Sequence, residues 1–314
     1  MARKVILDVD PGIDDALALC LALFDPRLEV LAVTAVAGNV SSQQATRNVQ
    51  TIIEQLDPPR WPRLGAASPN EQGAGVDARY IHGADGLGNA HFDVAELHHL
   101  NDSEKVIGDI LRSNPDEVSL VCLGPLTNVA GAFRRDPVLP TLIDRLIFMG
   151  GTYLAPGNVT PVAEFNMAAD PVAAREVFHS RTTKTMVPLD VTSPVTLSYD
   201  FLDELPDDTS RVGRFLRRIL PFAYRAYRQH YGLESIHVHD AVALQIILRR
   251  DLFLIEEVAA DIETAGELTT GATIFDRRAN RQWRENMEVA IRTDPAAVKR
   301  EIVEGIRRAA HAAG

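Results

Sequence analysis

The chain has 314 residues, of which 46% are hydrophobic and 24% are charged, and its formal net charge is −11. This acidic balance argues against a nucleic-acid-binding protein, which usually presents a basic face. The two cysteines are too few for a disulfide framework, and no run approaches the roughly 20 apolar residues that cross a membrane. We therefore expect a cytoplasmic protein, in contact with neither nucleic acid nor membrane, that handles a small neutral ligand or a cation.

In the first half of the chain, short apolar runs alternate with helical segments. The predicted order is a strand at 5–9, a helix at 13–24, a strand at 28–36, a helix at 41–56, a loop at 70–100, a strand at 118–123, and a helix that follows Gly124-Pro125 and runs through Phe133. Ser41 or Ser42 is suited to cap the second helix. The loop is rich in Gly, His and Asn, and loops of that length are often functional.

The second half of the chain continues this alternation. The predicted order is a strand at 142–149, a helix at 170–178, a strand at 185–187, helices at 208–231 and 240–250, strands at 253–262 and 288–293, and a helix at 295–311. Pro221 predicts a break or kink in the helix at 208–231. The βαβ rhythm predicts one α/β domain, residues 1–314, with a central, mostly parallel sheet flanked by helices.

Four of the eight residues from Asp8 to Asp15 are aspartates. The segment lies at the carboxyl end of the first predicted strand, where open α/β sheets bind ligands. Carboxylates this close together repel one another, and burying them without partners is costly. A divalent cation removes both problems, and a set of several carboxylates favours Ca²⁺ over Mg²⁺. A turn or helix cap is the alternative for a single aspartate, but Asp10 is hard to explain in that way when Asp14 and Asp15 crowd the same helix end.

The segment from Asp8 to Ala16 resembles the N-terminal signature of the inosine–uridine-preferring nucleoside hydrolases. Further segments resemble other motifs of that family in order along the chain: Gly38-Asn39, His82 to Gly88, Leu123 to Asn128, Met149 to Gly151, Gly157-Asn158, Ala163 to Asn166 and His239 to Ala241. The resemblance implies a single α/β domain and hydrolysis of the N-glycosidic bond of ribonucleosides to ribose and free base. It also implies a homodimer or homotetramer.

The resemblance further implies a Ca²⁺ site. Its ligands would be the side chains of Asp10, Asp15 and Asp240 and the backbone carbonyl of Leu123. The cation would acidify the attacking water and orient the ribose diol. Asp10 would touch that water, which makes it the candidate general base. Asp8 is then left with a structural role.

Several short polar side chains in these motifs are suited to the ribose hydroxyls: Asp14, Asn39, Asn158, Glu164 and Asn166. Met149 is assigned to the substrate pocket by its motif. His239 follows directly before Asp240, and its ordinary pKa suits proton donation to the leaving base. His82, in the predicted loop, is a candidate base contact. For either histidine, a position in the core or on the surface is the alternative.

The helix at 208–231 carries three tyrosines on one face, Tyr224, Tyr227 and Tyr231. They form either a core stripe or contacts to the base, and we assign Tyr227 and Tyr231 to the base. Ala223 and Tyr227 are the counterparts of the two positions that distinguish the pyrimidine-preferring branch of the family from its broader branch. Together they combine features of both branches. The histidine pair is more similar to the pyrimidine branch, so we expect uridine and cytidine as favoured substrates and inosine as a further one.

Two other functions fit parts of the sequence. A catalytically silent protein on the same fold would bind nucleosides without releasing the base. A phosphatase of the haloacid dehalogenase type also opens with a strand and Asp-x-Asp, but there a small residue and Thr follow the second aspartate. Here Pro11-Gly12 follows Asp10, which disfavours the phosphatase.

Overall fold

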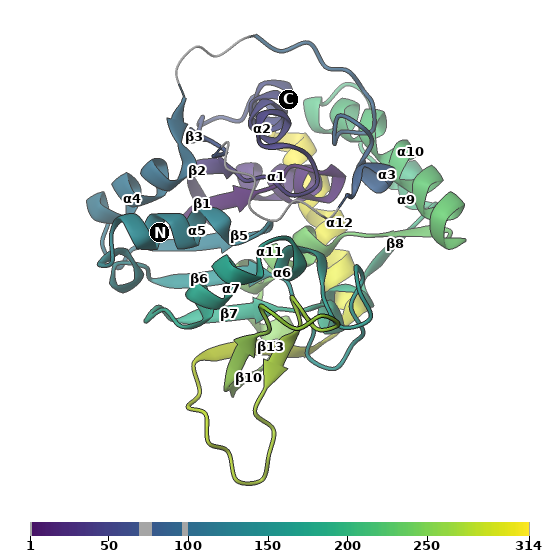
Figure 1. Ribbon diagram of the computed structural model, residues 1–314. Coiled ribbons are helices and arrows are strands. Elements are labelled where there is room, and N and C mark those ends of the chain that lie inside the picture. The colour runs from purple at the N-terminus through teal and green to yellow at the C-terminus, as the bar shows by residue number, and fades with distance from the viewer. Residues whose placement is uncertain (1, 69–76, 96–99, 314) are drawn as a thin grey trace.

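A nine-stranded sheet forms the centre of the fold, with the strand order β10-β13-β7-β6-β5-β1-β2-β3-β4 (Figure 1). The computed structural model describes residues 2–68, 77–95 and 100–313. Adjacent strands of the sheet pair in parallel except for the antiparallel pair β10 and β13. The strands are β1 (Arg3–Val9), β2 (Leu28–Ala35), β3 (Arg63–Ala66), β4 (Asn101–Asp102), β5 (Val118–Cys122), β6 (Arg145–Met149), β7 (Lys184–Val187), β10 (Phe253–Val258) and β13 (Met287–Thr293). The expected single α/β domain with a mostly parallel sheet is confirmed.

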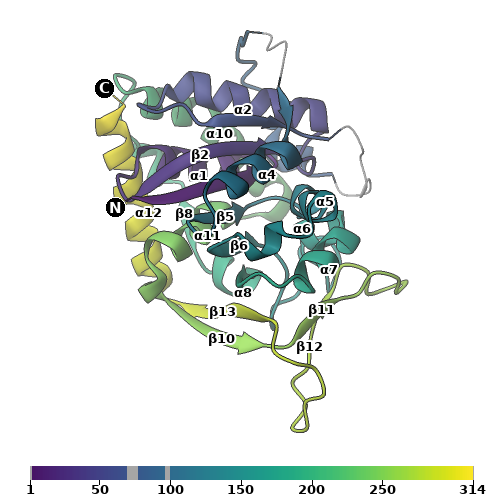
Figure 2. The ribbon, with the colours of Figure 1, turned by 90° about the vertical axis from the view of Figure 1, so that its left-hand side faces the viewer.

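Both faces of the sheet are covered by helices, because its strands are apolar on both sides. In β1, Val5 and Leu7 pack into one hydrophobic cluster and Ile6 packs into the other. The first face is covered by α1 (Ile13–Phe24), α2 (Ser42–Leu56), α10 (Arg211–Tyr231), α11 (His239–Leu248) and α12 (Pro295–Ala312). The second face is covered by α4 (Ser103–Ser113), α5 (Thr127–Arg135) and α7 (Pro171–Phe178) (Figure 2).

Shorter elements connect these layers. The short helices are α3 (Arg79–His82), α6 (Phe165–Ala169), α8 (Leu189–Thr192) and α9 (Phe201–Glu204), with 3-10 turns at Leu139–Thr141 and Arg250–Leu252. Two small antiparallel pairs are formed by β8 (Thr196–Ser198) with β9 (Ser235–His237), and by β11 (Ala260–Ile262) with β12 (Thr273–Phe275). The chain between β11 and β13 extends away from the body of the domain (Figure 1).

Most predicted elements are present close to their expected bounds. Helix α1 spans the predicted residues, and Ser41 caps α2 by accepting a hydrogen bond from the backbone N–H of Gln44. The strand predicted at 142–149 begins only at Arg145, because residues 142–144 form the turn that follows the 3-10 helix Leu139–Thr141. Both cysteines are buried.

Three expectations about this fold were wrong. The segment 253–262 is not one strand but β10 and β11, which belong to different sheets. Pro221 does not break its helix, since α10 continues through it, and a kink at Pro221 stays a prediction. The predicted loop at 70–100 contains the short helix α3, and residues 69–76 and 96–99 of that loop lie outside the described residues. Helix α4 and strands β3 and β4 are not among the predicted elements.

The direction of chain progression reverses between β1 and β5. From β1 the chain adds β2, β3 and β4 on one side, and β5, β6 and β7 follow on the other side. Ligand sites in open α/β sheets lie at such a switch point, beyond the carboxyl ends of the strands. Asp10 directly follows β1 and Leu123 directly follows β5, so the sheet topology brings two distant motifs to the same place.

Candidate active site

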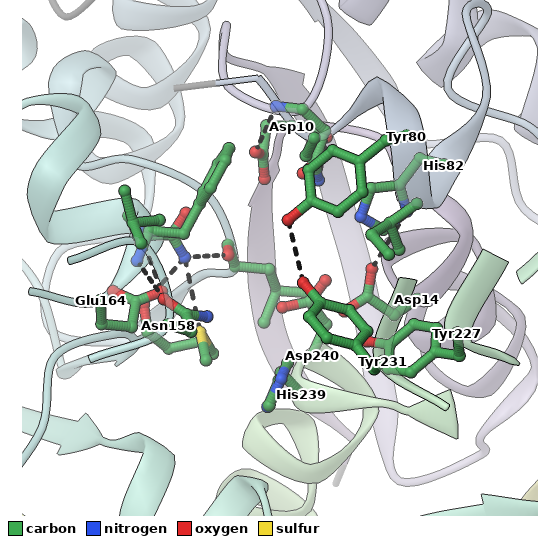
Figure 3. Close-up of a pocket in the computed structure, with 18 residues that line it drawn as sticks. Asp10, Asp14, Tyr80, His82, Asn158, Glu164, Tyr227, Tyr231, His239 and Asp240 are labelled. Carbon is green, nitrogen blue, oxygen red and sulfur yellow. Dashed lines mark hydrogen bonds and ion pairs between the residues drawn. The ribbon is translucent and has the colours of Figure 1, made fainter. Parts of the chain in front are cut away.

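A pocket of about 110 Å³ opens beyond the carboxyl ends of the central strands (Figure 3). Of the fourteen residues assigned to the site from the sequence, thirteen line it: Asp10, Asp14, Asn39, His82, Leu123, Met149, Asn158, Glu164, Asn166, Tyr227, Tyr231, His239 and Asp240. The other, Asp15, is fully buried and is grouped with the pocket residues Asp14 and Asp240. The fold therefore gathers every one of these residues at one site.

The carboxylate of Asp10 is held in a space that two glycines leave open. Its Oδ2 accepts a hydrogen bond of 2.9 Å from the backbone N–H of Asn39. A Cβ atom at Gly38 would lie 2.1 Å from Oδ2, and one at Gly124 would lie 2.5 Å from Oδ1. The turns after β2 and β5 thus need glycine because their backbones approach Asp10 closely.

Three other aspartates form a compact acidic group. Asp14, Asp15 and Asp240 each offer a carboxylate oxygen, and these oxygens lie within 4.8 Å of one another. Asp15 Oδ2 accepts a hydrogen bond from the backbone N–H of Gly12, but Asp15 Oδ1 is buried without a partner. An unsatisfied buried carboxylate oxygen facing two more carboxylates suits a divalent cation with oxygen ligands.

The electrostatics of this region show how costly the uncompensated charges are. Burial raises the pKa of Asp10 and of Asp240 well above the usual range, and the neighbouring aspartates raise it further. Burial also raises the pKa values of Asp14 and Asp15. In the absence of a counter-charge, protons would compensate the cluster.

The side-chain ligands predicted from the sequence are Asp10, Asp15 and Asp240, whereas the compact acidic group contains Asp14, Asp15 and Asp240. Asp10 lies outside the group, although its charge acts on Asp240. Leu123, the expected carbonyl ligand, has its oxygen 2.7 Å from Nδ2 of Asn166. A carbonyl oxygen has two lone pairs, so this bond leaves one lone pair for a cation. The same amide nitrogen of Asn166 also donates to the carbonyl of Met149.

Glu164 and Asn158 form the wall opposite Asp14 and Tyr227 (Figure 3). Glu164 caps α6, because its carboxylate accepts backbone N–H groups of Gly151, Asn166 and Met167. Burial nevertheless raises the pKa of Glu164 to about 7. Asn158 Oδ1 accepts the backbone N–H of Phe165. Both side chains are therefore fixed in position by the loop that leads into α6.

Two histidines form part of the other side of the pocket. Nδ1 of His82 accepts a hydrogen bond of 3.1 Å from the backbone N–H of Ile13 and lies 3.9 Å from Asp14 Oδ1. Nδ1 of His239 lies 2.8 Å from Thr192 Oγ1. Burial lowers the pKa of His82 to about 4 and that of His239 to about 3. Burial thus favours the neutral form of both rings.

Aromatic side chains border the histidines. Tyr231 packs against Tyr227 with ring centroids 5.5 Å apart, and its hydroxyl lies 2.9 Å from that of Tyr80 at the pocket edge (Figure 3). Tyr224, in contrast, is a core residue whose hydroxyl donates to the carbonyl of Ser198. Ala223 lines a small adjoining cavity rather than this pocket.

Asp8 is separate from the site. Its Oδ1 accepts hydrogen bonds from Thr34 Oγ1 at 2.6 Å and from Asn128 Nδ2 at 2.8 Å. Burial raises the pKa of Asp8 to about 7. Asp8 therefore joins β1, β2 and α5 beneath the pocket.

Five residues that line the pocket were not identified from the sequence: Ala78, Tyr80, Ile81, Val159 and Phe165. Tyr80 and Ile81 are in α3, next to His82, so their proximity to a predicted site residue is the signal that could have found them. His237, also not assigned to the site from the sequence, stacks on His239 with ring centroids 5.1 Å apart. Thr192 has no local sequence signal, since it is 47 residues from His239.

Among the described residues, none of the helices combines the length and apolar character that a membrane crossing requires.

Comparisons with known proteins agree with the site. The family model of the inosine-uridine preferring nucleoside hydrolases matches residues 5–300. The non-specific ribonucleoside hydrolase RihC of Salmonella enteritidis is 36% identical over 301 residues, which cover 96% of each chain. A solved plant nucleoside hydrolase has 28% identity and a TM-score of 0.89, covering 98% of this chain and 99% of its own. The purine-preferring ribonucleoside hydrolase of Gardnerella vaginalis has 28% identity, a TM-score of 0.88 and the same coverage. By sequence, fold and site, the chain belongs to the inosine-uridine preferring nucleoside hydrolase family, and it is a ribonucleoside N-glycosyl hydrolase.

Proposed function

We propose that this enzyme uses Ca²⁺ to hydrolyse ribonucleosides to ribose and free base, with uridine and cytidine favoured and inosine also accepted. The observation that carries the proposal is the buried acidic group beside Asp10, at one end of a pocket whose other walls hold amides, histidines and tyrosines. The acidic end suits a cation and sugar hydroxyls, whereas the aromatic end suits a base.

The residues proposed to hold the cation are Asp10, Asp15, Asp240 and the carbonyl of Leu123. Their oxygens suit Ca²⁺, which accepts six to eight oxygen ligands in a flexible arrangement. The unpaired Asp15 Oδ1 supports this set, and so does the closeness of the two oxygens from Asp15 and Asp240. Asp14 lies in the same acidic group and is proposed to contact the ribose from there.

Asp10 is proposed as the general base. A bound cation would supply Lewis acidity to the attacking water and would orient the ribose diol. The water oxygen bonds to C1′ as the C1′–N bond breaks, and the bonding electron pair leaves with the base. Asp10 takes one proton from the water, and a proton from solvent neutralises the departing base, so the products are ribose and neutral base. The N–H of Asn39 and the two glycine turns hold the Asp10 carboxylate in place for this step.

The ribose is proposed to lie between Asp14 and the opposite wall of amides. Asn39, Asn158, Glu164 and Asn166 line this part of the pocket. Because Glu164, Asn158 and Asn166 are already bonded to backbone groups, they are rigid before the substrate arrives. A deoxyribonucleoside would leave some of these buried polar groups unpaired, so we expect strong selection for ribose.

The base is proposed to lie among His82, His239, Tyr227 and Tyr231. Aromatic rings stack on any base, and fixed N–H groups of the histidines can bond to its acceptors. The histidine pair supports the preference for uridine and cytidine. The proposal that inosine is accepted as well is supported by similarity to a relative named as a non-specific ribonucleoside hydrolase.

A cytoplasmic location is proposed from the composition, and a homodimer or homotetramer is proposed from the family resemblance. The mass of the purified enzyme by light scattering tests this assignment, and a monomer at micromolar concentration would contradict it.

The central test measures free ribose released from uridine, cytidine, inosine and adenosine, with and without a chelator. We expect the ratio kcat/KM to be highest for uridine and cytidine, and 2′-deoxyuridine to be a poor substrate. Turnover should stop with the chelator and return with Ca²⁺. Binding of nucleosides without ribose release would instead support a catalytically silent protein.

A further inference from the structure

Thr192 contacts His239 from outside the pocket. It ends α8, its side chain is fully buried, and its Oγ1 lies 2.8 Å from Nδ1 of His239. Thr192 is not among the residues that line the pocket, whereas His239 is. Any effect of Thr192 on a bound nucleoside must therefore pass through the imidazole.

The direction of this hydrogen bond follows from the hydroxyl group. A hydroxyl has one hydrogen to donate, and a helical threonine often gives it to the carbonyl four residues earlier. That carbonyl belongs to Pro188, which accepts the backbone N–H groups of Val191 and Thr192. Within the described part of the chain, the hydroxyl of Thr192 has His239 Nδ1 as its partner. If Nδ1 carried the hydrogen instead, the buried hydroxyl hydrogen would be left without an acceptor, which is costly.

We propose that Thr192 is a positioning residue whose hydroxyl donates to Nδ1 of His239 and so keeps the ring hydrogen on Nε2, the nitrogen left free for the base. This inference rests on the proposed function, because the tautomer of His239 affects the rate at the step in which the base departs. As the C1′–N bond breaks, the electron pair moves onto the base, and the Nε2–H group of His239 stabilises the negative charge by a hydrogen bond. The other tautomer would turn a lone pair toward that charge.

The surroundings of His239 restrain the ring in the same way. His237 stacks on it with an angle of 14° between the ring planes, so rotation of the imidazole is hindered. His82, on the neighbouring wall, follows the same principle. Its Nδ1 accepts the backbone N–H of Ile13, and a backbone N–H can only donate, so neutral His82 also carries its hydrogen on Nε2. The pocket thus presents two imidazoles whose inner nitrogens are both acceptors bonded to protein donors.

The first experiment compares Thr192→Val, which has nearly the same shape but no hydroxyl, with Thr192→Ser, which keeps the hydroxyl. Thr182→Val is the matched control, because the Thr182 hydroxyl is buried without a partner. Each variant is assayed on uridine and on 4-nitrophenyl riboside, whose leaving group departs as a stable anion. We expect Thr192→Val to lower kcat on uridine by about 10- to 100-fold, by analogy with the loss of the partner that orients a metal-ligating histidine. The rate on 4-nitrophenyl riboside should change little, and both Thr192→Ser and Thr182→Val should retain activity on uridine.

The second experiment needs no substrate. Nitrogen NMR of the histidine-labelled, full-length enzyme identifies which ring nitrogen carries hydrogen, with His239 assigned from His239→Gln. The expected result is hydrogen on Nε2 in the wild type and in Thr192→Ser, and a shift toward Nδ1 in Thr192→Val. Hydrogen on Nδ1 in the wild type would overturn the proposal, and so would an equal loss of rate on both substrates. If the wild type released no ribose from any ribonucleoside, the proposed function would fail, while the NMR result would still decide the tautomer.

Discussion

At the scale of single residues, Asp8 and Asp10 show how two aspartates at one strand end take different roles. Asp8 bonds to Thr34 and Asn128 away from the pocket, whereas Asp10 lines the pocket. The difference comes from their neighbours. Polar side chains from β2 and α5 surround Asp8, and glycine turns leave space around Asp10.

Replacing Asp10 by Asn is expected to preserve the fold and to lower kcat on uridine by about 10³-fold or more, since the variant has neither a general base nor a charged oxygen at that position. Asp8→Asn is the matched control, because it keeps the acceptor for Thr34 and Asn128, and its activity should stay near that of the wild type. Thermal unfolding checks that both variants fold. Near-normal turnover of Asp10→Asn would remove Asp10 as the general base.

At the scale of elements, the turns after β2 and β5 determine where the Asp10 carboxylate lies. Gly38→Ala places a Cβ atom on Asp10 Oδ2, at 2.1 Å in the present geometry, so the carboxylate must move. We expect kcat/KM on uridine to fall by about 10²-fold, the effect of a displacement near 1 Å in a reacting group.

Gly108→Ala is the control for that substitution. Gly108 lies inside α4, and the nearest atom to an added Cβ there is Leu139 Cδ1, at an ordinary contact distance of 3.5 Å. Alanine favours a helix over glycine by about 1 kcal/mol, so Tm should rise slightly while activity is unchanged. Equal activity of the two glycine variants would contradict the account of the turn.

The contact between the end of α1 and α12 predicts a pH dependence of stability. Burial alone would raise the pKa of Asp25, but hydrogen bonds and charge from Arg27, together with Arg308, hold that pKa below its usual range. A lowered folded-state pKa contributes stability above the unfolded value, about 3.9, and loses it as the pH falls through the folded value.

Asp25→Asn should therefore lower Tm at pH 7 by about 2–4 °C, which corresponds to about 1 kcal/mol once solvent screening of the exposed arginines is allowed for. The difference in Tm between wild type and variant should shrink as the pH is lowered from 5 toward 3.5. Calorimetry across this range checks it. A Tm difference that stays constant with pH would show that the ion pairs are not its source.

At the scale of the whole molecule, the proposed cation site joins an early and a late segment of the chain. Asp15 is in α1 and Asp240 is in α11, and their carboxylates are packed together without a counter-charge among the described residues. A cation bound there should stabilise the fold, by about 2.7 kcal/mol when its concentration is 100 times its Kd.

We therefore expect Tm to fall on treatment with a chelator and to rise again with Ca²⁺, and to a smaller extent with Mg²⁺. In Asp240→Asn the rise with Ca²⁺ should be much smaller. If Ca²⁺ left the Tm of the wild-type enzyme unchanged, the acidic group would not be a calcium site.

The sequence by itself determined the fold class, the family and most residues of the pocket. Apolar runs and helix caps specify strands and helices locally, and the motifs of the family are short contiguous segments that remain readable without a structure. Residues such as Asp10, Asn39 and Asp240 could be assigned from these motifs because their chemistry is unusual where they stand.

Only the tertiary structure decided how those residues contact one another. The fold groups Asp14, rather than Asp10, with Asp15 and Asp240, and it separates Tyr224 in the core from Tyr227 and Tyr231 at the pocket. It also brings Thr192 to His239 and Tyr80 to Tyr231. Such contacts depend on how distant segments of the chain cross the sheet and on which polar groups are buried without a local partner. Local sequence patterns determine neither of these.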